Sequence, residues 1–405
     1  MNRDIQIIRD LAKKYTEISA APVMNDRRQL WRDLHSLKKI RPLIHVRQYA
    51  FNELLQSNCV CEDALCREIE FTLRDKLYAA SLNDDTVFEP YYSVRALFLD
   101  TDWGVQIQKN HTGDSGGAFK VDYVLENLEV WPKALSAPQH RIDEPATTEK
   151  VNRVSDILGG LLTVDVNSSP YYMHWHGDLS SDLGLLRGME NFMVDMLDEP
   201  EELHRLMSFM RDGILRAQQQ AEDAGDWCAS ASLNQAVPYA HGLTDPAANR
   251  TGVHRSELWG FFAAQEFTMV SPAMHEEFLL QYQLPIMEKF GMVAYGCCED
   301  LTKKIDMLRR IPNLHRIAVT PFADVQKCAE QIGKDYVISY RPSPADMVAY
   351  GFDENRIRRI LSRDFEFLKN SCFDITLKDV ETVEKDSDRV RKWIALTREV
   401  IEDML

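Results

Sequence analysis

Short apolar segments alternate with helical patterns along most of this chain. The clearest example runs from Gly291 to Pro321. An apolar run of strand type at Met292–Tyr295 is followed by a polar turn, a helical pattern and a second short strand at 316–320. The helical spacing is carried by Leu301, Ile305, Leu308 and Ile311. A strand, a turn, a helix and another strand make one unit of a parallel α/β fold.

The same alternation predicts eight strands, most of them followed by a helix. They lie near residues 44, 95, 164, 229, 294, 318, 338 and 375. Eight is the strand count of a (β/α)8 TIM barrel. Doubly wound sheets usually announce a glycine-rich phosphate turn, and the chain contains neither GxGxxG nor GxxxxGK[ST]. We therefore predict an α/β protein in which residues 1–405 form one TIM barrel domain.

Two segments extend the predicted barrel. Residues 1–40 read as two helices ahead of the first strand and form an N-terminal helical extension. Between residues 100 and 145 the periodicity is lost among glycines, prolines and tryptophans, which indicates a long insertion. Loops of that length in a compact enzyme usually serve as lids or as interface pieces. A homodimer is among the assemblies we consider.

Charge and composition narrow the class of protein. The formal charge of −16 and the pI near 5.2 argue against nucleic acid or an anionic membrane surface as a partner. No apolar run reaches the length of a membrane span, and the first residues do not open a signal peptide. We expect a soluble, cytoplasmic protein with a small-molecule substrate, in which the eight cysteines stay reduced.

The richest candidate chemistry follows the strand at Met292–Tyr295. Barrel enzymes place their chemistry at the carboxyl ends of strands, and Cys297, Cys298 and Glu299 fall at such a point. Thiolates and a carboxylate are suitable zinc ligands, and Glu299 is also a catalytic candidate. The alternative is a pair of buried cysteines beside a helix-capping acid.

Other candidates lie near further strand ends. His174 and His176 occupy an irregular loop that either enters a cleft or packs among aromatics. Glu266 is a catalytic candidate that sits among aromatic residues, which would raise its pKa if it is buried, although it could face solvent. Lys378 and Asp379 close the last strand and form either a catalytic or anion-binding pair or a structural salt bridge.

The remaining candidates complete the list. Tyr295 and Glu89 join His174 and His176 as substrate-binding candidates. Cys372 precedes the last strand, so we assign it to packing at the opposite face. We predict that Cys297, Glu299, Glu266 and the loop with His174 and His176 converge in one cleft.

Three stretches resemble the uroporphyrinogen decarboxylase superfamily. They are Asp195–His204, Ser271–Phe278 continuing to Tyr295–Glu299, and Asp335–Ser339. The resemblance covers roughly residues 150–405 and implies a (β/α)8 barrel. The superfamily includes zinc-dependent methyltransferases that work with corrinoid proteins. The chain departs from the decarboxylases at Arg47-Gln48-Tyr49-Ala50-Phe51, where the second arginine of an arginine-rich stretch is missing.

For the methyltransferase branch, the resemblance implies a zinc site and a corrinoid protein as partner. By position, Tyr295 replaces the histidine ligand of that branch, Cys297 matches its first cysteine, and Lys378 stands near its distant cysteine. Cys298, Glu299 and His176 are then the replacements available to the metal. Three functions stay open: a zinc-dependent methyltransferase, a metal-free decarboxylase or lyase acting on a carboxylated small molecule, and a non-catalytic binding barrel.

Overall fold

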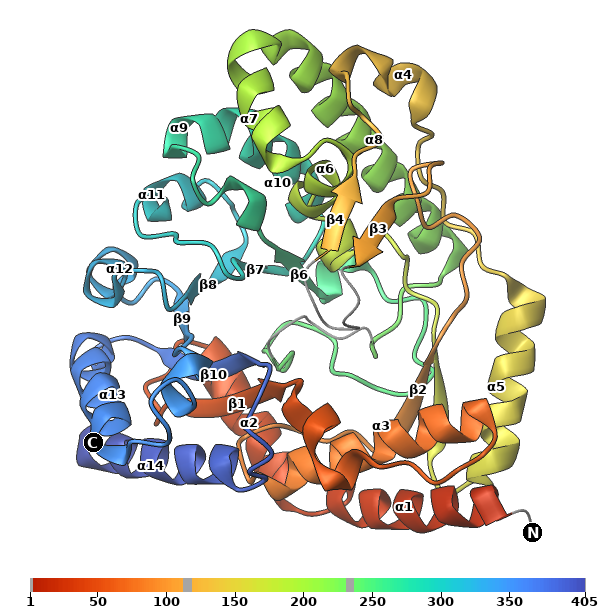
Figure 1. The fold of residues 1–405 in the computed structure, drawn as a ribbon, viewed down its shortest axis with the longest axis vertical. Coiled ribbons are helices and arrows are strands. Elements are labelled where there is room, and N and C mark those ends of the chain that lie inside the picture. The colour runs from red at the N-terminus through yellow and green to blue at the C-terminus, as the bar shows by residue number, and fades with distance from the viewer. Residues whose placement is uncertain (1–2, 112–118, 231–236, 405) are drawn as a thin grey trace.

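Parallel strands and surrounding helices give the chain a curled, barrel-like α/β fold in the computed structural model, which describes residues 3–111, 119–230 and 237–404. Six strands form one parallel sheet in the order β1-β10-β9-β8-β7-β6, and β2 pairs in parallel with β5 (Figure 1). The parallel strands are β1 (Leu43–Gln48), β2 (Tyr91–Arg95), β5 (Thr163–Asn167), β6 (Trp259–Phe262), β7 (Met292–Tyr295), β8 (Leu314–Val319), β9 (Val337–Tyr340) and β10 (Phe373–Val380).

Helices cover the outside of the curled sheet (Figure 1). The α-helices are α1 (Arg3–Ser19), α2 (Val23–His35), α3 (Ala64–Ser81), α4 (Trp131–Ala134), α5 (Glu144–Leu158), α6 (Ser180–Leu186), α7 (Met189–Asp198), α8 (Pro200–Ala224), α9 (Pro272–His275), α10 (Gln281–Met287), α11 (Ile305–Leu308), α12 (Val325–Ile332), α13 (Glu354–Leu368) and α14 (Arg389–Met404). Short turns of tighter or wider helix are η1 (Ala50–Glu53), η2 (Leu55–Ser57), η3 (Leu128–Val130), η4 (His174–His176), η5 (Arg255–Glu257), η6 (Gln265–Phe267), η7 (Glu276–Leu280) and η8 (Pro344–Met347).

Burial on both faces explains why the short strands β6 and β9 are largely apolar. All four residues of β6 and all four of β9 are buried, as expected for parallel strands covered on both faces. Helix ends follow local rules: the Asp63 side chain accepts the backbone N–H of Cys66 at the start of α3. Gly225 ends α8 in the left-handed conformation, at φ 76°.

The expected closed eight-stranded barrel is confirmed only as a barrel-like fold. Among the described residues, the six-stranded sheet and the β2–β5 pair are separate hydrogen-bonded groups. The strand predicted near residue 229 is wrong, because the backbone N–H of Cys228 donates to the Ser169 Oγ at 2.9 Å and that of Ala229 to the Arg250 carbonyl at 2.8 Å. Those groups are therefore not paired in a strand ladder. Residues 231–232 of that predicted strand lie outside the described part of the chain, in which the next strand after α8 is β6.

The segments outside the predicted barrel have structure of their own. Helix α1 packs against α3 and α5 around a second apolar cluster that includes Ile8, Ile69 and Val154. Within residues 100–145, β3 (Gln108–His111) pairs antiparallel with β4 (Phe119–Asp122). The predicted helix from Leu301 to Ile311 is only the short α11. No helix in the described part of the chain is long and apolar enough to cross a membrane.

Candidate active site

A tight turn after β7 carries the two thiols. Gly296 has a φ of 101°, a conformation that side-chain-bearing residues rarely adopt. A Cβ placed there would lie 2.7 Å from the Leu301 Cδ1 and 3.0 Å from the Ala318 Cβ. Glycine is therefore required both by the backbone and by the neighbours, and it directs Cys297 and Cys298 beyond the strand end.

Glu299 holds this turn through both of its carboxylate oxygens. Its side chain is buried; one oxygen accepts the backbone N–H of Ala264 at 2.8 Å and the other accepts that of Cys297 at 2.7 Å. Both carboxylate oxygens are thus engaged by main-chain donors at the ends of β6 and β7. This structural use differs from the catalytic and metal-binding roles predicted for Glu299.

The predicted pair from the last strand meets the two thiols. The Lys378 Nζ lies 2.9 Å from the Cys298 Sγ and 3.6 Å from the Cys297 Sγ, and the two sulfurs are 3.5 Å apart. In the sheet, β8 and β9 lie between β7 and β10. The contact therefore spans the inside of the curled sheet instead of joining neighbouring strands.

The two thiols differ electrostatically. Because the Cys297 thiol is placed to donate to the Cys298 sulfur, the pKa of Cys298 is lowered, with Lys378 lowering it further. The same hydrogen bond raises the pKa of Cys297, and burial adds to that effect. Burial by itself lowers the pKa of Lys378, but the adjacent thiols and Asp379 outweigh it and shift the pKa upward. These directions favour a Cys298 thiolate beside a Lys378 ammonium.

A bulge at the end of β10 brings the consecutive side chains of Lys378 and Asp379 to the same side of the strand, beside Cys298. The pairing of β1 with β10 shifts register between Val46 and Gln48, opposite this end of β10, and Asp379 has a φ of 57°. Successive side chains on a regular strand point to opposite faces, yet Asp379 forms an ion pair with Lys378 and its Oδ2 lies 3.7 Å from the Cys298 Sγ. Bulges of this kind redirect side chains near functional sites.

A cavity of about 350 Å³ opens beside these groups. Its lining combines Cys298, Lys378 and Asp379 with a mainly apolar wall: Pro321, Phe322, Pro342, Ser343 and Pro344. Arg341, buried directly after β9, also lines the cavity and donates to the Cys297 carbonyl. Sequence reasoning missed Arg341, although its position at a predicted strand end could have identified it.

Tyr295 belongs to a buried polar network. Its hydroxyl donates to the Gln283 Oε1 at 2.9 Å and lies 3.0 Å from the His275 Nε2. Gln283 in turn donates to the carbonyls of Asp178 and Ala263. Burial raises the pKa of Tyr295 and lowers that of His275, so both are neutral. The network links α9 and α10 to the end of β7, and the predicted substrate-binding role of Tyr295 stays a prediction.

The histidine loop approaches the thiols through Trp175. This indole belongs to the apolar cluster that contains Cys297 and Phe261, with ring centroids 5.1 Å apart in the Trp175–Phe261 pair. His176 stacks on Tyr171 at 4.3 Å, and its Nδ1 lies 3.3 Å from an Asp182 oxygen. His174 has a φ of 52° and its ring lies edge-on to Phe261. The two histidines therefore pack against aromatic rings, and their predicted role in binding a substrate stays a prediction.

Two carboxyl groups near this loop have raised pKa values. The Ser180 hydroxyl donates to Glu266 at 2.6 Å, and burial raises the pKa of Glu266, with a further contribution from Glu299. Asp178 is fully buried; burial and then the charge of Glu266 raise its pKa well above the ordinary value. Glu266 and Glu299 are therefore electrostatically coupled, as the predicted convergence requires. The full convergence with Cys297 and the histidines stays a prediction.

Glu89 lies elsewhere. It precedes β2 and forms an ion pair with Arg28 of α2 at 3.2 Å. Because β2 runs parallel to β5, Glu89 lies at the amino ends of these strands, whereas His174 and His176 follow the carboxyl end of β5. The structure therefore does not bring Glu89 together with the other substrate-binding candidates.

The predicted zinc ligands do not form a ligand set. Among the described residues, no group of three or more His, Cys, Asp or Glu side chains is placed to hold a metal ion. A buried ammonium lies against the two thiols, Glu299 is held by two backbone donors, and His176 is stacked on Tyr171. Zinc sites require three or four converging donors, so these residues do not fit the metal.

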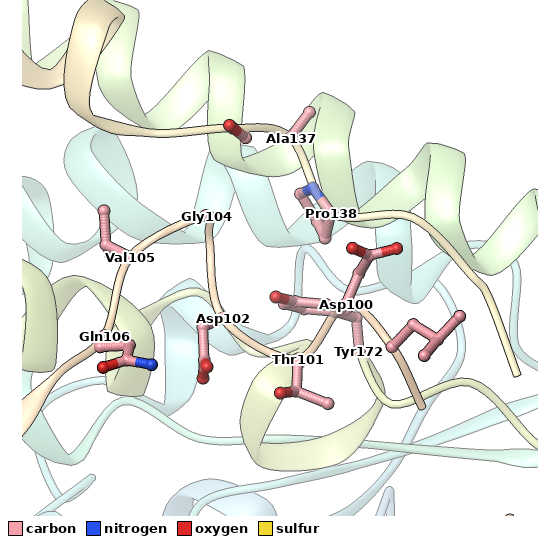
Figure 2. A pocket seen from close by; sticks show the side chains of 11 residues that line it. Asp100, Thr101, Asp102, Gly104, Val105, Gln106, Ala137, Pro138 and Tyr172 are labelled. Atoms are coloured by element: carbon pink, nitrogen blue, oxygen red, sulfur yellow. The ribbon is translucent and has the colours of Figure 1, made fainter. Parts of the chain in front are cut away.

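A second cavity, of about 300 Å³, lies in the 100–145 segment (Figure 2). Its wall includes Asp100, Asp102 and Pro138 together with Tyr172 of the histidine loop. In Figure 2 the side chain of Asp100 lies between Pro138 and Tyr172. The insertion therefore packs on the same loop that carries His174 and His176, and its role as a lid or an interface piece stays a prediction.

The fold of this chain is similar to that of a protein of known structure. Neither a family model nor a curated protein sequence matches this chain. A methyltransferase from Methanosarcina mazei has a similar structure, with a TM-score of 0.52 and 13% sequence identity over 92% of this chain and 97% of that one. The chain has the fold of that methyltransferase. At this identity the likeness concerns the fold alone, so activity must be argued from the site.

Proposed function

We propose that the protein is a methyltransferase that moves a methyl group between a small molecule and a corrinoid protein. The observation that carries the proposal is the Cys298 sulfur, 2.9 Å from the Lys378 Nζ, in a cavity at the carboxyl ends of the strands. Thiolate sulfur is a strong nucleophile for saturated carbon. Lys378 and Arg341 favour a substrate with an anionic group, which Asp379 alone would repel.

Exposed apolar side chains support a protein partner. Leu55 after β1, Met269 after β6, Phe322 after β8 and Tyr350 after β9 expose 84%, 84%, 78% and 74% of their surface. Each lies between the carboxyl end of a parallel strand and the α-helix that comes next in the chain. Exposed apolar groups gathered on one face are typical of docking surfaces, and a corrinoid protein that docks there would bring its cobalt to the cavity.

Methyl transfer to free cob(I)alamin, a stand-in for the corrinoid protein, tests this function. Methylated thioethers, methylamines and methoxylated aromatic acids are offered as donors without oxygen, and methylcobalamin formation is followed by absorbance. We expect turnover with at least one donor and a loss of at least about tenfold in Cys298→Ser. Cys372→Ser is the matched control, since Cys372 is also a partly exposed free thiol. Absence of turnover with every donor contradicts the proposal.

A carboxy-lyase is the second candidate, and the buried acids Asp178 and Glu266 favour it. Carboxyl groups with raised pKa values can donate and accept protons near neutral pH. Release of CO2 from carboxylated substrates, abolished in Glu266→Gln but retained in Cys298→Ser, would favour this reaction over methyl transfer.

A further inference from the structure

Lys378 is placed as the counter-charge of a sulfur nucleophile. Its side chain is 5% exposed, and its Nζ contacts Cys298, Cys297 and Asp379. A buried ammonium is costly unless negative groups surround it. One carboxylate and two sulfurs meet that need, and each also stabilises the positive charge on Lys378.

The two sulfurs differ in how accessible they are from the cavity. Cys297 is 2% exposed and packs in the apolar cluster with Phe261, whereas Cys298 is partly exposed and lines the cavity. A molecule entering the cavity therefore meets the Cys298 Sγ. The buried Cys297 thiol lies 3.5 Å from that sulfur and hydrogen-bonds to it.

We infer that Cys298 forms a covalent bond to small electrophilic molecules that carry an anionic group, with Lys378 in place of a metal ion as the partner of its thiolate. In this step the sulfur donates an electron pair to a saturated carbon and a C–S bond forms. The bond from that carbon to the leaving group breaks, and its electron pair departs with the leaving group. Nothing is oxidised or reduced, and Lys378 keeps its proton.

The preference for an anionic molecule follows from the charges of the wall. The cavity wall contains two positive side chains, Lys378 and Arg341, and one negative side chain, Asp379. Once the sulfur is alkylated its negative charge is gone, so the two cations are left with one carboxylate. An anionic group on the incoming molecule restores the balance. This inference goes beyond the proposed function, because it requires neither a methyl donor nor a corrinoid.

Iodoacetamide and iodoacetate test the inference, since they have nearly the same shape and differ by one charge. The full-length protein is labelled at neutral pH and each cysteine is followed by peptide mass spectrometry. We expect Cys298 to react about tenfold faster than Cys372, which is also a partly exposed thiol. The ratio of the iodoacetate rate to the iodoacetamide rate should also be higher at Cys298 than at Cys372.

Substitutions of Lys378 distinguish the effect of its charge on the labelling rate of Cys298 from the effect of the exposure of that thiol. Lys378→Met should slow the labelling of Cys298 by about tenfold or more, and Lys378→Arg should restore most of the rate, because the positive charge returns. Cys372 should react at the same rate in all three proteins, which shows that the variants are folded. If Lys378→Met does not fold, the comparison of Cys298 with Cys372 in the wild type and in Lys378→Arg decides.

Labelling in the presence of zinc is the last part of the test. Added in equimolar amount, it should leave the rate at Cys298 unchanged, because the ammonium occupies the space between the donors. Protection of Cys298 by zinc, equal rates at Cys298 and Cys372, or an unchanged rate in a folded Lys378→Met would each overturn the inference. These readouts are independent of methyl transfer, so this inference and the proposed function can fail separately.

Discussion

The carboxylate of Glu299 accepts the backbone N–H of Ala264, a residue 35 positions earlier in the chain, at 2.8 Å. Its second oxygen accepts the N–H of Cys297. One buried side chain thus fixes the ends of β6 and β7 relative to each other. The position of the two thiols depends on this bridge, because Glu299 holds the backbone N–H of Cys297 and Cys298 is the next residue.

Replacement of Glu299 by glutamine tests this bridge. The amide keeps one acceptor oxygen but turns an NH2 group toward a backbone donor, which leaves that N–H without an acceptor. We expect a loss of about 1–3 kcal/mol in the free energy of unfolding, measured with urea. Glu149→Gln, on the exposed side of α5, is the control and should change little. An equal effect in both variants would show that the bridge does not stabilise the fold.

The sequence indicated the β7 turn because Met292–Tyr295 is apolar and Gly296 interrupts it. It could not indicate the contact of Lys378 with Cys298, which joins residues 80 positions apart across the inside of the sheet. That contact depends on the curvature of the sheet and on the bulge at Asp379. Neither property leaves a periodic signal in the chain.

The missed strand β6 has a different cause. Trp259–Phe262 is only four residues long and wholly buried, and periodicity cannot distinguish so short an apolar run from a helical or irregular segment. The region near residue 229 is similarly apolar, but its backbone groups bond to Ser169 and Arg250. Tertiary hydrogen bonds, which the sequence pattern does not show, decided the second case.

Gly296→Ala tests the turn that carries the thiols. Alanine adds strain at φ 101° and brings its Cβ to 2.7 Å from Leu301, so we expect a loss of about 1–3 kcal/mol or more in the free energy of unfolding. Gly160→Ala is a matched control: Gly160 has a φ of 78°, but a Cβ there meets nothing within 4 Å. The difference between the two thermal unfolding curves isolates the crowding, and equal curves would contradict it.

A buried ion pair inside the curled sheet gives the third prediction. Arg316 of β8 and Asp374 of β10 are both fully buried, with 2.6 Å between Nη1 and Oδ2. Arg316→Met leaves the Asp374 charge without its partner, so we expect a loss of about 3–5 kcal/mol in the free energy of unfolding.

The double variant Arg316→Met/Asp374→Leu should lose less than the sum of the two single variants, because no charge is then left buried. Urea unfolding of all four proteins completes the cycle. Lys369→Met removes an ion pair with Glu366 on the surface and should change little. Additive losses would mean that the two side chains do not stabilise each other.

The buried carboxyl of Asp178 makes stability depend on pH. Burial and the charge of Glu266 raise its pKa in the folded protein above the ordinary 3.8. Between these two values the folded chain binds more protons than the unfolded chain, so stability falls as pH rises. The stabilising contribution is fully present below the ordinary pKa and is lost as pH rises through the folded one. Asp178→Asn cannot ionise and removes this contribution.

We therefore expect the free energy of unfolding to fall less steeply with pH in Asp178→Asn than in the wild type, by up to about 1.4 kcal/mol per pH unit. Urea unfolding at several pH values above about 4 measures the slopes. Asp198→Asn, exposed on α7, should leave the slope unchanged. A wild-type slope in Asp178→Asn would mean that Asp178 titrates alike in the folded and unfolded chains.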